Sequence, residues 1–193
     1  MGTIVWELCV WLVVVVYYHV AEVVMVILYN KSELSWSSTL ITLPYLLALG
    51  IGFVEFGLEW WWLHEWKRWL SMPCLLVGTC VTLGADTFRK FAMAHARVSF
   101  THRIKEERRP EHVLVTDGPY AWCRHPAYLG WFWWSMGTQI MLANPVCCLL
   151  FAVLAWRFFK IRIPYEEYYL EQMFGEAYAI YKLKTPTRIP FIK

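Results

Sequence analysis

Three stretches of this chain are long and apolar enough to cross a lipid bilayer as helices. They cover residues 4–28, 40–63 and 70–88. The hydrocarbon core of a bilayer is about 30 Å thick, and a helix needs about 20 apolar residues to cross it. Hydrophobic residues make up 59% of the chain and charged residues 17%, a balance that is unusual for a soluble globular domain. The sequence therefore predicts an all-α polytopic membrane protein.

Two shorter apolar runs, residues 127–143 and 146–159, are joined by Asn144 and Pro145. A helix of about 16 residues extends about 24 Å, which is marginal for a full crossing. We therefore expect the two runs to form a tight helical hairpin that the longer helices shield from lipid. With the hairpin, the chain has about five transmembrane helices. Beyond Pro164, residues 165–183 predict a separate amphipathic helix.

The basic residues predict which side of the membrane each segment faces. The segment that follows the third apolar run holds many of them: Arg89, Lys90, Arg97, Arg103, Lys105, Arg108 and Arg109. Lys and Arg in short loops favour the cytosolic side, so we expect this segment, and the C-terminal region with it, to face the cytosol. The chain then forms a single integral-membrane domain, residues 1–193, with a mainly transmembrane scaffold in 1–100 and a cofactor and catalytic region in 101–193.

Charge and cysteine content exclude several classes of partner. The net charge is +3 and no long basic tract is present, so we expect no nucleic-acid partner. The six cysteines show no C-x-x-C spacing, and most lie inside apolar runs. We therefore expect neither a bound metal nor a framework of disulfides.

The first apolar run contains three polar residues, Glu7, His19 and Glu22. His19 and Glu22 are three residues apart and therefore share one helix face. Hydrogen bonds between transmembrane helices commonly use such side chains. We expect the pair to fix the packing of the first helix rather than to take part directly in catalysis.

A polar heptad, residues 124–130, stands between the apolar runs and reads Arg-His-Pro-Ala-Tyr-Leu-Gly. It follows the segments 112–115 and 118–120. About 30 residues later come Arg162 and the acidic pair Glu166 and Glu167. Polar groups this close to lipid are expensive and usually mark function. We therefore expect the chemistry of this protein to lie around the heptad.

The sequence from residue 112 to 193 resembles the isoprenylcysteine carboxyl methyltransferase family. The heptad alone is less specific, because amine methyltransferases and sterol reductases carry related versions of R-H-P-x-Y-x-G. The further matching elements are His112-Val113-Leu114-Val115-Thr116, Gly118-x-Tyr120, Gly137-Thr138-Gln139, Asn144-Pro145, Trp156-Arg157-Phe158-Phe159, Phe174-Gly175-Glu176-x-Tyr178-x-x-Tyr181 and Pro190-Phe191-Ile192-Lys193. Tyr18-His19-x-x-Glu22 also resembles the first core helix of the family.

The resemblance implies S-adenosyl-L-methionine as methyl donor and the prenylated C-terminal cysteine of a processed CaaX protein, of the small GTPase type, as acceptor. It also implies a multi-pass protein of the endoplasmic reticulum membrane with a cytosolic active site. The implied donor contacts are Lys105, His112, Val113, Leu114, Val115, Tyr120, His125, Pro126, Ala127, Tyr128 and Glu166. Arg162 matches the arginine that contacts the prenylcysteine, and Arg162 and Glu166 are the implied catalytic residues. At the position of Lys105 the family can supply a glutamine, whereas an ammonium group cannot accept a hydrogen bond.

The chemistry of this acceptor can be argued from the residues alone. An α-carboxyl group has a pKa of about 3.3–3.7, so at neutral pH the acceptor is already an anion. Its attack on a sulfonium methyl group needs no general base, only alignment and the removal of water. We expect Arg162 to hold the anion through a bidentate pair. Glu166 suits the cationic or hydroxyl-bearing parts of the donor, and the backbone of residues 113–115 suits adenine.

Three alternatives differ from this prediction in what they require. Methylation of a phospholipid amine, on the same fold, gains nothing from Arg162. An NADPH-dependent sterol reductase would have additional helices, which this short chain lacks. A non-enzymatic membrane adaptor would bind no S-adenosylmethionine.

Overall fold

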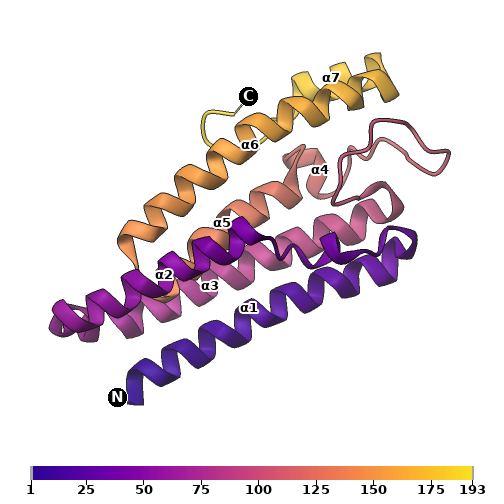
Figure 1. The fold of residues 1–193 in the computed structure, drawn as a ribbon. Coiled ribbons are helices and arrows are strands. Elements are labelled where there is room, and N and C mark those ends of the chain that lie inside the picture. Colours follow the sequence, from indigo (N-terminus) through magenta and orange to yellow (C-terminus); the bar gives the residue numbers. More distant parts are fainter. Residues whose placement is uncertain (1, 193) are drawn as a thin grey trace.

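The computed structural model describes residues 2–192, and within that range every regular element is a helix. The helices lie side by side in a bundle (Figure 1), in which α5 packs against both α3 and α6, and α1 packs against α3. The α-helices are α1 (Gly2–Tyr29), α2 (Leu43–Trp62), α3 (His64–Ala96), α4 (Pro119–Trp122), α5 (Pro126–Met141), α6 (Pro145–Phe174) and α7 (Glu176–Lys184). Short 3₁₀ turns occupy Lys31–Glu33, Trp36–Thr39 and Arg97–Ser99.

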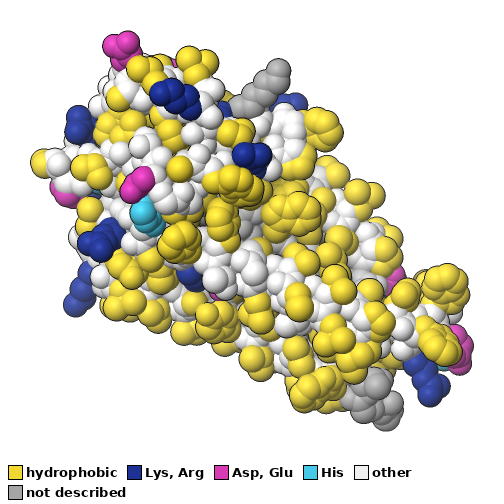
Figure 2. All heavy atoms as spheres, turned by 180° about the vertical axis from the view of Figure 1, so that it is seen from behind, with side chains coloured by type: hydrophobic (Ala, Val, Ile, Leu, Met, Phe, Trp, Pro, Cys, Tyr) yellow, Lys and Arg dark blue, Asp and Glu magenta, His cyan; other side chains and the backbone are white. Residues whose placement is uncertain are grey.

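Three segments are long and apolar enough to cross a membrane: Ile4–Tyr29, Trp36–Trp62 and His64–Ser99. Many large apolar side chains on these helices are exposed, among them Leu12, Leu47 and Leu76. Figure 2 shows yellow apolar side chains over the length of one face, with most of the charged groups gathered toward its ends. Such a surface suits lipid rather than water. The protein is therefore a membrane protein with an all-helical fold.

The third helix begins earlier than the sequence pattern predicts. We expected a span over residues 70–88, but α3 begins at His64, directly after α2 ends, and runs 33 residues to Ala96. The physical reason lies at Lys67, which is buried in the first turns of α3. Its ammonium group pairs with Glu59 of α2 and donates to Asn144 Oδ1 at 3.1 Å. A charge that would end an apolar span is satisfied by its neighbours, so the helix continues through it.

The hairpin prediction is confirmed in shape, because α5 and α6 are joined by a tight turn at residues 142–144. The prediction of a separate helix after Pro164 is wrong. Helix α6 continues through Pro164 to Phe174, and the break comes at Gly175, where φ is +57°. A proline inside a helix removes one N–H donor. Pro164 is exposed, so its ring stands clear of neighbouring helices.

Close approach between α3 and α5 brings the hairpin into the bundle. A Cβ atom on Gly78 would lie 2.7 Å from Met141 Cα, and one on Gly137 would lie 3.0 Å from the backbone nitrogen of Thr82. Only glycine fits where two helix backbones lie this close. Tyr18 of α1 stacks on Trp134 of α5 with ring centroids 3.9 Å apart. These contacts fix where the first turn of α5, which carries the polar heptad, lies relative to α1 and α3.

Two groups of polar contacts lie at opposite ends of the bundle. At one end Glu33, in the connection between α1 and α2, pairs with Lys105 and Arg109 of the segment that follows α3. At the other end Lys67 links the α2–α3 turn to the α5–α6 turn through the carbonyl of Ala143, at 2.9 Å. Figure 1 shows the same arrangement, with the long loop after α3 at one end and the α2–α3 turn at the other.

Glu22 is fully buried and joins α1 to α3. Its carboxylate accepts from Arg89 Nε at 2.6 Å and Nη2 at 2.9 Å, and from Lys90 at 2.6 Å. His19 bonds instead to the carbonyl of Thr39 and the hydroxyl of Tyr45. The expectation that this pair makes interhelical contacts is confirmed, although the two side chains use different partners.

Candidate active site

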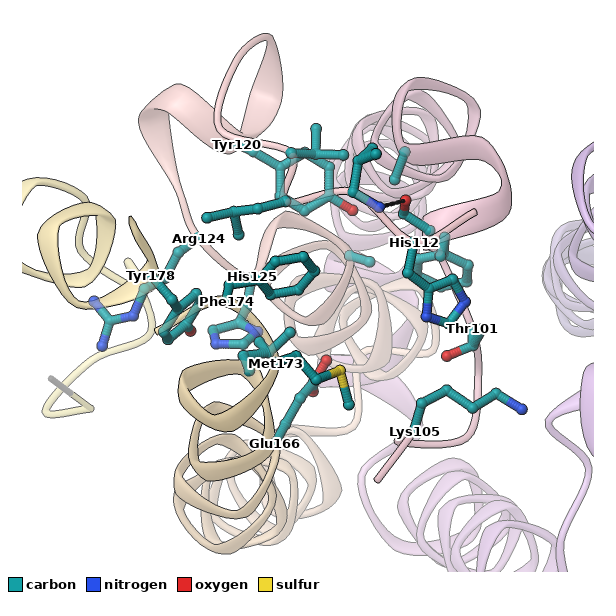
Figure 3. A pocket seen from close by; sticks show the side chains of 18 of the residues that line it. Thr101, Lys105, His112, Tyr120, Arg124, His125, Glu166, Met173, Phe174 and Tyr178 are labelled. Carbon is teal, nitrogen blue, oxygen red and sulfur yellow. Dashed lines mark hydrogen bonds between the residues drawn. The ribbon is translucent and has the colours of Figure 1, made fainter. Parts of the chain in front are cut away.

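One cavity opens at the end of the bundle where the loop after α3 lies (Figure 3). Its walls come from residues 96–128 and from the C-terminal part of α6 with α7. Its empty space, counted together with its open mouth, is about 910 Å³. We call the segment of residues 97–118, which forms one wall, the strap.

The cavity brings together all eleven residues that the sequence singled out as donor contacts. Its lining includes Lys105, His112, Val113, Leu114, Val115, Tyr120, His125, Pro126, Ala127, Tyr128 and Glu166. These residues span more than 60 positions of the chain, and the fold places them around one space. Arg162 does not line the cavity; it lies behind Tyr128, to which it is hydrogen-bonded.

Sequence reasoning missed part of the lining on α6 and α7. Leu170, Met173 and Phe174 border the cavity together with Glu166, and Tyr178 borders it from α7. Positions 166, 170, 173 and 174 follow the i, i+4, i+7, i+8 spacing of one helix face. The spacing becomes informative only once α6 is known to continue through Pro164. The polar residue of that face, Glu166, then marks which apolar residues share its surroundings.

Two buried polar atoms of the cavity have no hydrogen-bond partner among the described residues. They are His112 Nε2 and the hydroxyl of Tyr178, and Figure 3 shows the two side chains on opposite sides of the space. Burial and the nearby charge of Arg109 hold the pKa of His112 below its ordinary value, so the ring is neutral at neutral pH. Because buried polar groups are nearly always satisfied in folded proteins, a ligand with polar groups at both places is the simplest partner for them.

The strap offers backbone groups to the same space. The nitrogen of Val113 donates to Ser99 Oγ at 3.1 Å. Among the described residues, none forms a hydrogen bond with the backbone of Leu114 or Val115. Extended backbone with free N–H and C=O groups can pair with a flat heterocycle as one strand pairs with another.

Glu167 holds the floor of the cavity in place. Its carboxylate accepts from Arg124 Nε at 2.5 Å, His125 Nε2 at 3.0 Å and Lys182 Nζ at 3.0 Å. Burial alone would raise the pKa of Glu167, but the hydrogen bonds from His125 and Arg124 outweigh it and lower the pKa to about 2. The carboxylate is therefore ionised at neutral pH, and His125 Nε2 is occupied as a donor to it.

Tyr128 lies between the two predicted catalytic residues. Its hydroxyl donates to Glu166 Oε2 and accepts from Arg162 Nε, the latter at 2.8 Å. Its ring stacks between His125 and Phe159, at centroid distances of 5.4 and 4.9 Å. Among the described residues Arg162 and Glu166 form no direct ion pair, so the tyrosine hydroxyl separates them. A chain of hydrogen bonds therefore connects the cavity wall to Arg162.

Lys105 lines the cavity with its stem while its charge is used elsewhere. Its ammonium group pairs with Glu33 Oε2 at 2.7 Å, and Figure 3 shows the end of the side chain turned away from the cavity. Although burial acts to raise the pKa of Glu33, hydrogen bonds from Lys105 and Arg109 hold it below its ordinary value. Lys105 therefore anchors the strap to the α1–α2 connection.

Comparison with known proteins gives consistent results. The family model described as the isoprenylcysteine carboxyl methyltransferase (ICMT) family matches residues 76–172. Protein-S-isoprenylcysteine O-methyltransferase of Rattus norvegicus is 42% identical over 180 residues, covering 91% of this chain and 62% of the rat protein. Protein-S-isoprenylcysteine O-methyltransferase B of Arabidopsis thaliana is 41% identical, covering 92% of this chain and 90% of the plant protein.

The fold agrees as well. A solved structure of the eukaryotic intramembrane Ras methyltransferase ICMT superposes with a TM-score of 0.88 at 38% identity, covering 94% of this chain and 65% of that one. The chain spans about 62% of the length of the rat relative. This chain belongs to the isoprenylcysteine carboxyl methyltransferase family.

Proposed function

We propose that this protein transfers a methyl group from S-adenosyl-L-methionine to the C-terminal carboxylate of a prenylated cysteine in processed CaaX proteins. The observation that carries the proposal is the cavity itself. Eleven residues chosen from the sequence as donor contacts line one space, and that space contains two buried polar atoms without partners. Family membership supports methyl transfer to isoprenylcysteine.

The residues of the cavity fit this donor. His112 Nε2 and the Tyr178 hydroxyl gain partners from a ligand rich in hydroxyl and amino groups. The free backbone of Leu114 and Val115 suits the edge of adenine. Glu166 supplies a carboxylate for a cationic or hydroxyl-bearing part, and Tyr128 holds that carboxylate in place. When bound, S-adenosyl-L-methionine supplies an electrophilic methyl group on a sulfonium centre.

The acceptor is activated by alignment rather than by a base. A carboxylate with a pKa of about 3.3–3.7 is an anion at neutral pH, so its oxygen attacks the methyl carbon directly. The O–C bond forms while the S–C bond breaks, and no proton moves. We assign Arg162 to the acceptor carboxylate. Its Nε donates to Tyr128 and one Nη2 proton goes to the carbonyl of His102, so both protons of Nη1 and the second proton of Nη2 are left for the acceptor.

We further propose that the helices cross the membrane five times, with the strap on the cytosolic side of the endoplasmic reticulum. Helices α5 and α6 are not among the segments long and apolar enough by themselves. The proposal that they cross the membrane is supported by where their ends lie. The α5–α6 turn meets the α2–α3 turn at Lys67, and the strap meets the α1–α2 connection at Glu33. The hairpin therefore runs along the bundle from one end to the other.

The proposal predicts that donor and acceptor sites fail separately. Glu166→Ala should raise the dissociation constant of S-adenosylmethionine, measured by calorimetry in detergent, by about tenfold, as expected when one charge-assisted hydrogen bond is lost. Arg162→Lys keeps the charge but loses the planar fork, so it should raise the KM of a prenylcysteine and leave donor affinity unchanged. Unaltered donor affinity in Glu166→Ala, or full activity in Arg162→Ala, would reject the respective assignment, and the latter would favour an amine acceptor.

A further inference from the structure

We propose that His102, held by Glu22 of α1, is a positioning residue that aims Arg162 at the acceptor carboxylate. The inference rests on the proposed function, because it concerns how the acceptor is held. Arg162 is only partly buried, and a free arginine side chain on a helix surface would sample many rotamers. An anion can be aligned only if that freedom has been removed.

Two contacts fix the guanidinium plane of Arg162. Nε donates to the Tyr128 hydroxyl at 2.8 Å, and Nη2 donates to the backbone carbonyl of His102 at 2.7 Å. The group also lies over the rings of Tyr128 and Phe158, at 5.5 and 5.6 Å from their centroids. Among the described residues Nη1 has no hydrogen-bond partner. Its direction is therefore determined by where the two acceptors lie.

The first acceptor, Tyr128, belongs to the donor cavity. Its ring is stacked between His125 and Phe159, and its hydroxyl is bonded to Glu166. This contact fixes one edge of Arg162 relative to the methyl donor. A single contact still allows the planar group to rotate about it, so a second fixed point is required.

The second acceptor is a backbone carbonyl in the strap, which has no helix between Ser99 and Pro119. A carbonyl in such a segment stays in place only if a neighbouring group anchors it. The side chain of His102 provides the anchor, because its Nε2 lies 2.7 Å from Glu22 Oε2. Figure 3 shows the adjacent strap residues Thr101 and Lys105 at the wall of the cavity.

Glu22 is itself held by buried contacts. It is fully buried and accepts two hydrogen bonds from Arg89. Arg89 Nη1 in turn donates to the carbonyl of Ala127 at 2.8 Å, one residue before Tyr128. Both groups that accept hydrogen bonds from Arg162 are therefore held by the pair of Glu22 and Arg89, one through α5 and the other through the strap. Helix α1, which does not line the cavity, contributes to acceptor alignment through His102.

The test measures how strongly the protein prefers an acid over its ester. N-acetyl-S-farnesylcysteine carries the carboxylate that Arg162 would read, whereas its methyl ester does not. Wild-type protein should bind the acid more tightly. His102→Ala should reduce that preference by about tenfold, because an alignment error near one ångström has effects of this size or larger. Affinity for the ester and for S-adenosylmethionine should change by less than about twofold. His102→Gln, whose amide can still donate to Glu22, should recover part of the preference.

A matched control uses a second histidine that ties the strap. His95 of α3 pairs with Asp117 at 3.0 Å and contacts neither Arg162 nor its two acceptors, so His95→Ala should keep the preference for the acid. In an Arg162→Ala background, His102→Ala should have no further effect on the preference. Equal losses of acid and ester binding in His102→Ala, or additive effects in the double variant, would overturn the positioning role.

The outcomes also separate this inference from the proposed function. If wild-type protein binds acid and ester equally, the assignment of Arg162 fails and the role of His102 fails with it. If it prefers the acid but transfers no methyl group, the proposed reaction is wrong while the positioning of Arg162 stands. Glu22→Gln is a poorer variant, because it leaves Arg89 buried with an incomplete partner.

Discussion

At the scale of single residues, the polar groups of the site hold charges and positions, and none of them needs to move a proton. Glu167 is ionised, with a pKa of about 2. His125 donates to it and is thereby kept from accepting a proton at Nε2. The hydroxyl of Tyr128 is hydrogen-bonded to both Glu166 and Arg162. It therefore fixes their relative positions and does not transfer a proton. The chemistry of a carboxylate acceptor requires nothing more.

This arrangement predicts a flat pH profile. The acceptor carboxyl group and Glu167 both ionise well below neutral pH. The pKa of His112 is lowered, so this ring becomes protonated only at a pH lower than is usual for histidine. A folded-state pKa that lies below the usual value for histidine means that neutral His112 is retained as the pH falls toward that value. We therefore expect log kcat/KM to be level from about pH 6.5 to about pH 8.

The measurement is kcat/KM for N-acetyl-S-farnesylcysteine across that range, with each buffer checked for retained folding. A tenfold fall per unit below about pH 7, abolished by His125→Gln, would contradict the account. It would identify His125 as a general base.

At the scale of helices, α3 and α5 form the contact on which the site depends. A Cβ on Gly78 would lie 2.7 Å from Met141 Cα, so backbone would have to move. We expect Gly78→Ala to lower stability by about 1–3 kcal/mol, the usual cost of overpacking. Gly84, on the same helix, has nothing within 4 Å of its added Cβ. Gly84→Ala should therefore be neutral or stabilising by up to about 1 kcal/mol.

The two variants are compared by thermal unfolding in the same detergent. Because both replace a glycine of α3 by alanine, helix propensity cancels and only packing differs. Equal melting temperatures would show that α5 does not lie as close to α3 as described.

The helices also show how far the sequence could predict this fold. The lengths of the apolar runs were enough for α1 and α2, because crossing a bilayer sets a length, and the two shorter runs on either side of Asn144 and Pro145 were enough for the hairpin. The early start of α3 depends on Lys67 finding Glu59 and Asn144, which are distant in sequence or across a turn. The path of α6 through Pro164 depends on that proline being exposed. Neither condition is visible in local pattern.

The candidate site was also predictable from the sequence only in part. The heptad and the segment 112–115 identified nine of the 22 residues that line the cavity, since polar groups between apolar runs stand out. The conformation of the strap could not be predicted, because it has no periodicity and is held by distant carboxylates, Glu22 and Glu33. The indirect position of Arg162, behind Tyr128, also required the fold.

At the scale of the whole molecule, the two polar ends of the bundle should lie on opposite sides of the membrane. The strap meets the α1–α2 connection at Glu33, and the α2–α3 turn meets the hairpin turn at Lys67. An N-glycosylation acceptor inserted at the α2–α3 turn should be glycosylated in microsomes, and one inserted at residues 106–108 should not. The reverse pattern would place the cavity in the lumen and contradict the cytosolic orientation.

If the cavity methylates a prenylated carboxylate, labelled methyl should pass from S-adenosylmethionine to such an acceptor. Three acceptors are compared: N-acetyl-S-farnesylcysteine, the same compound as its methyl ester, and N-acetylcysteine. Each buried methylene-sized group contributes up to about 0.8 kcal/mol, so the account predicts a base-labile methyl ester from the first acceptor, none from the second, and a kcat/KM at least about a hundredfold lower for the third. Equal turnover of the prenylated and bare cysteines, or label in a base-stable product, would contradict it.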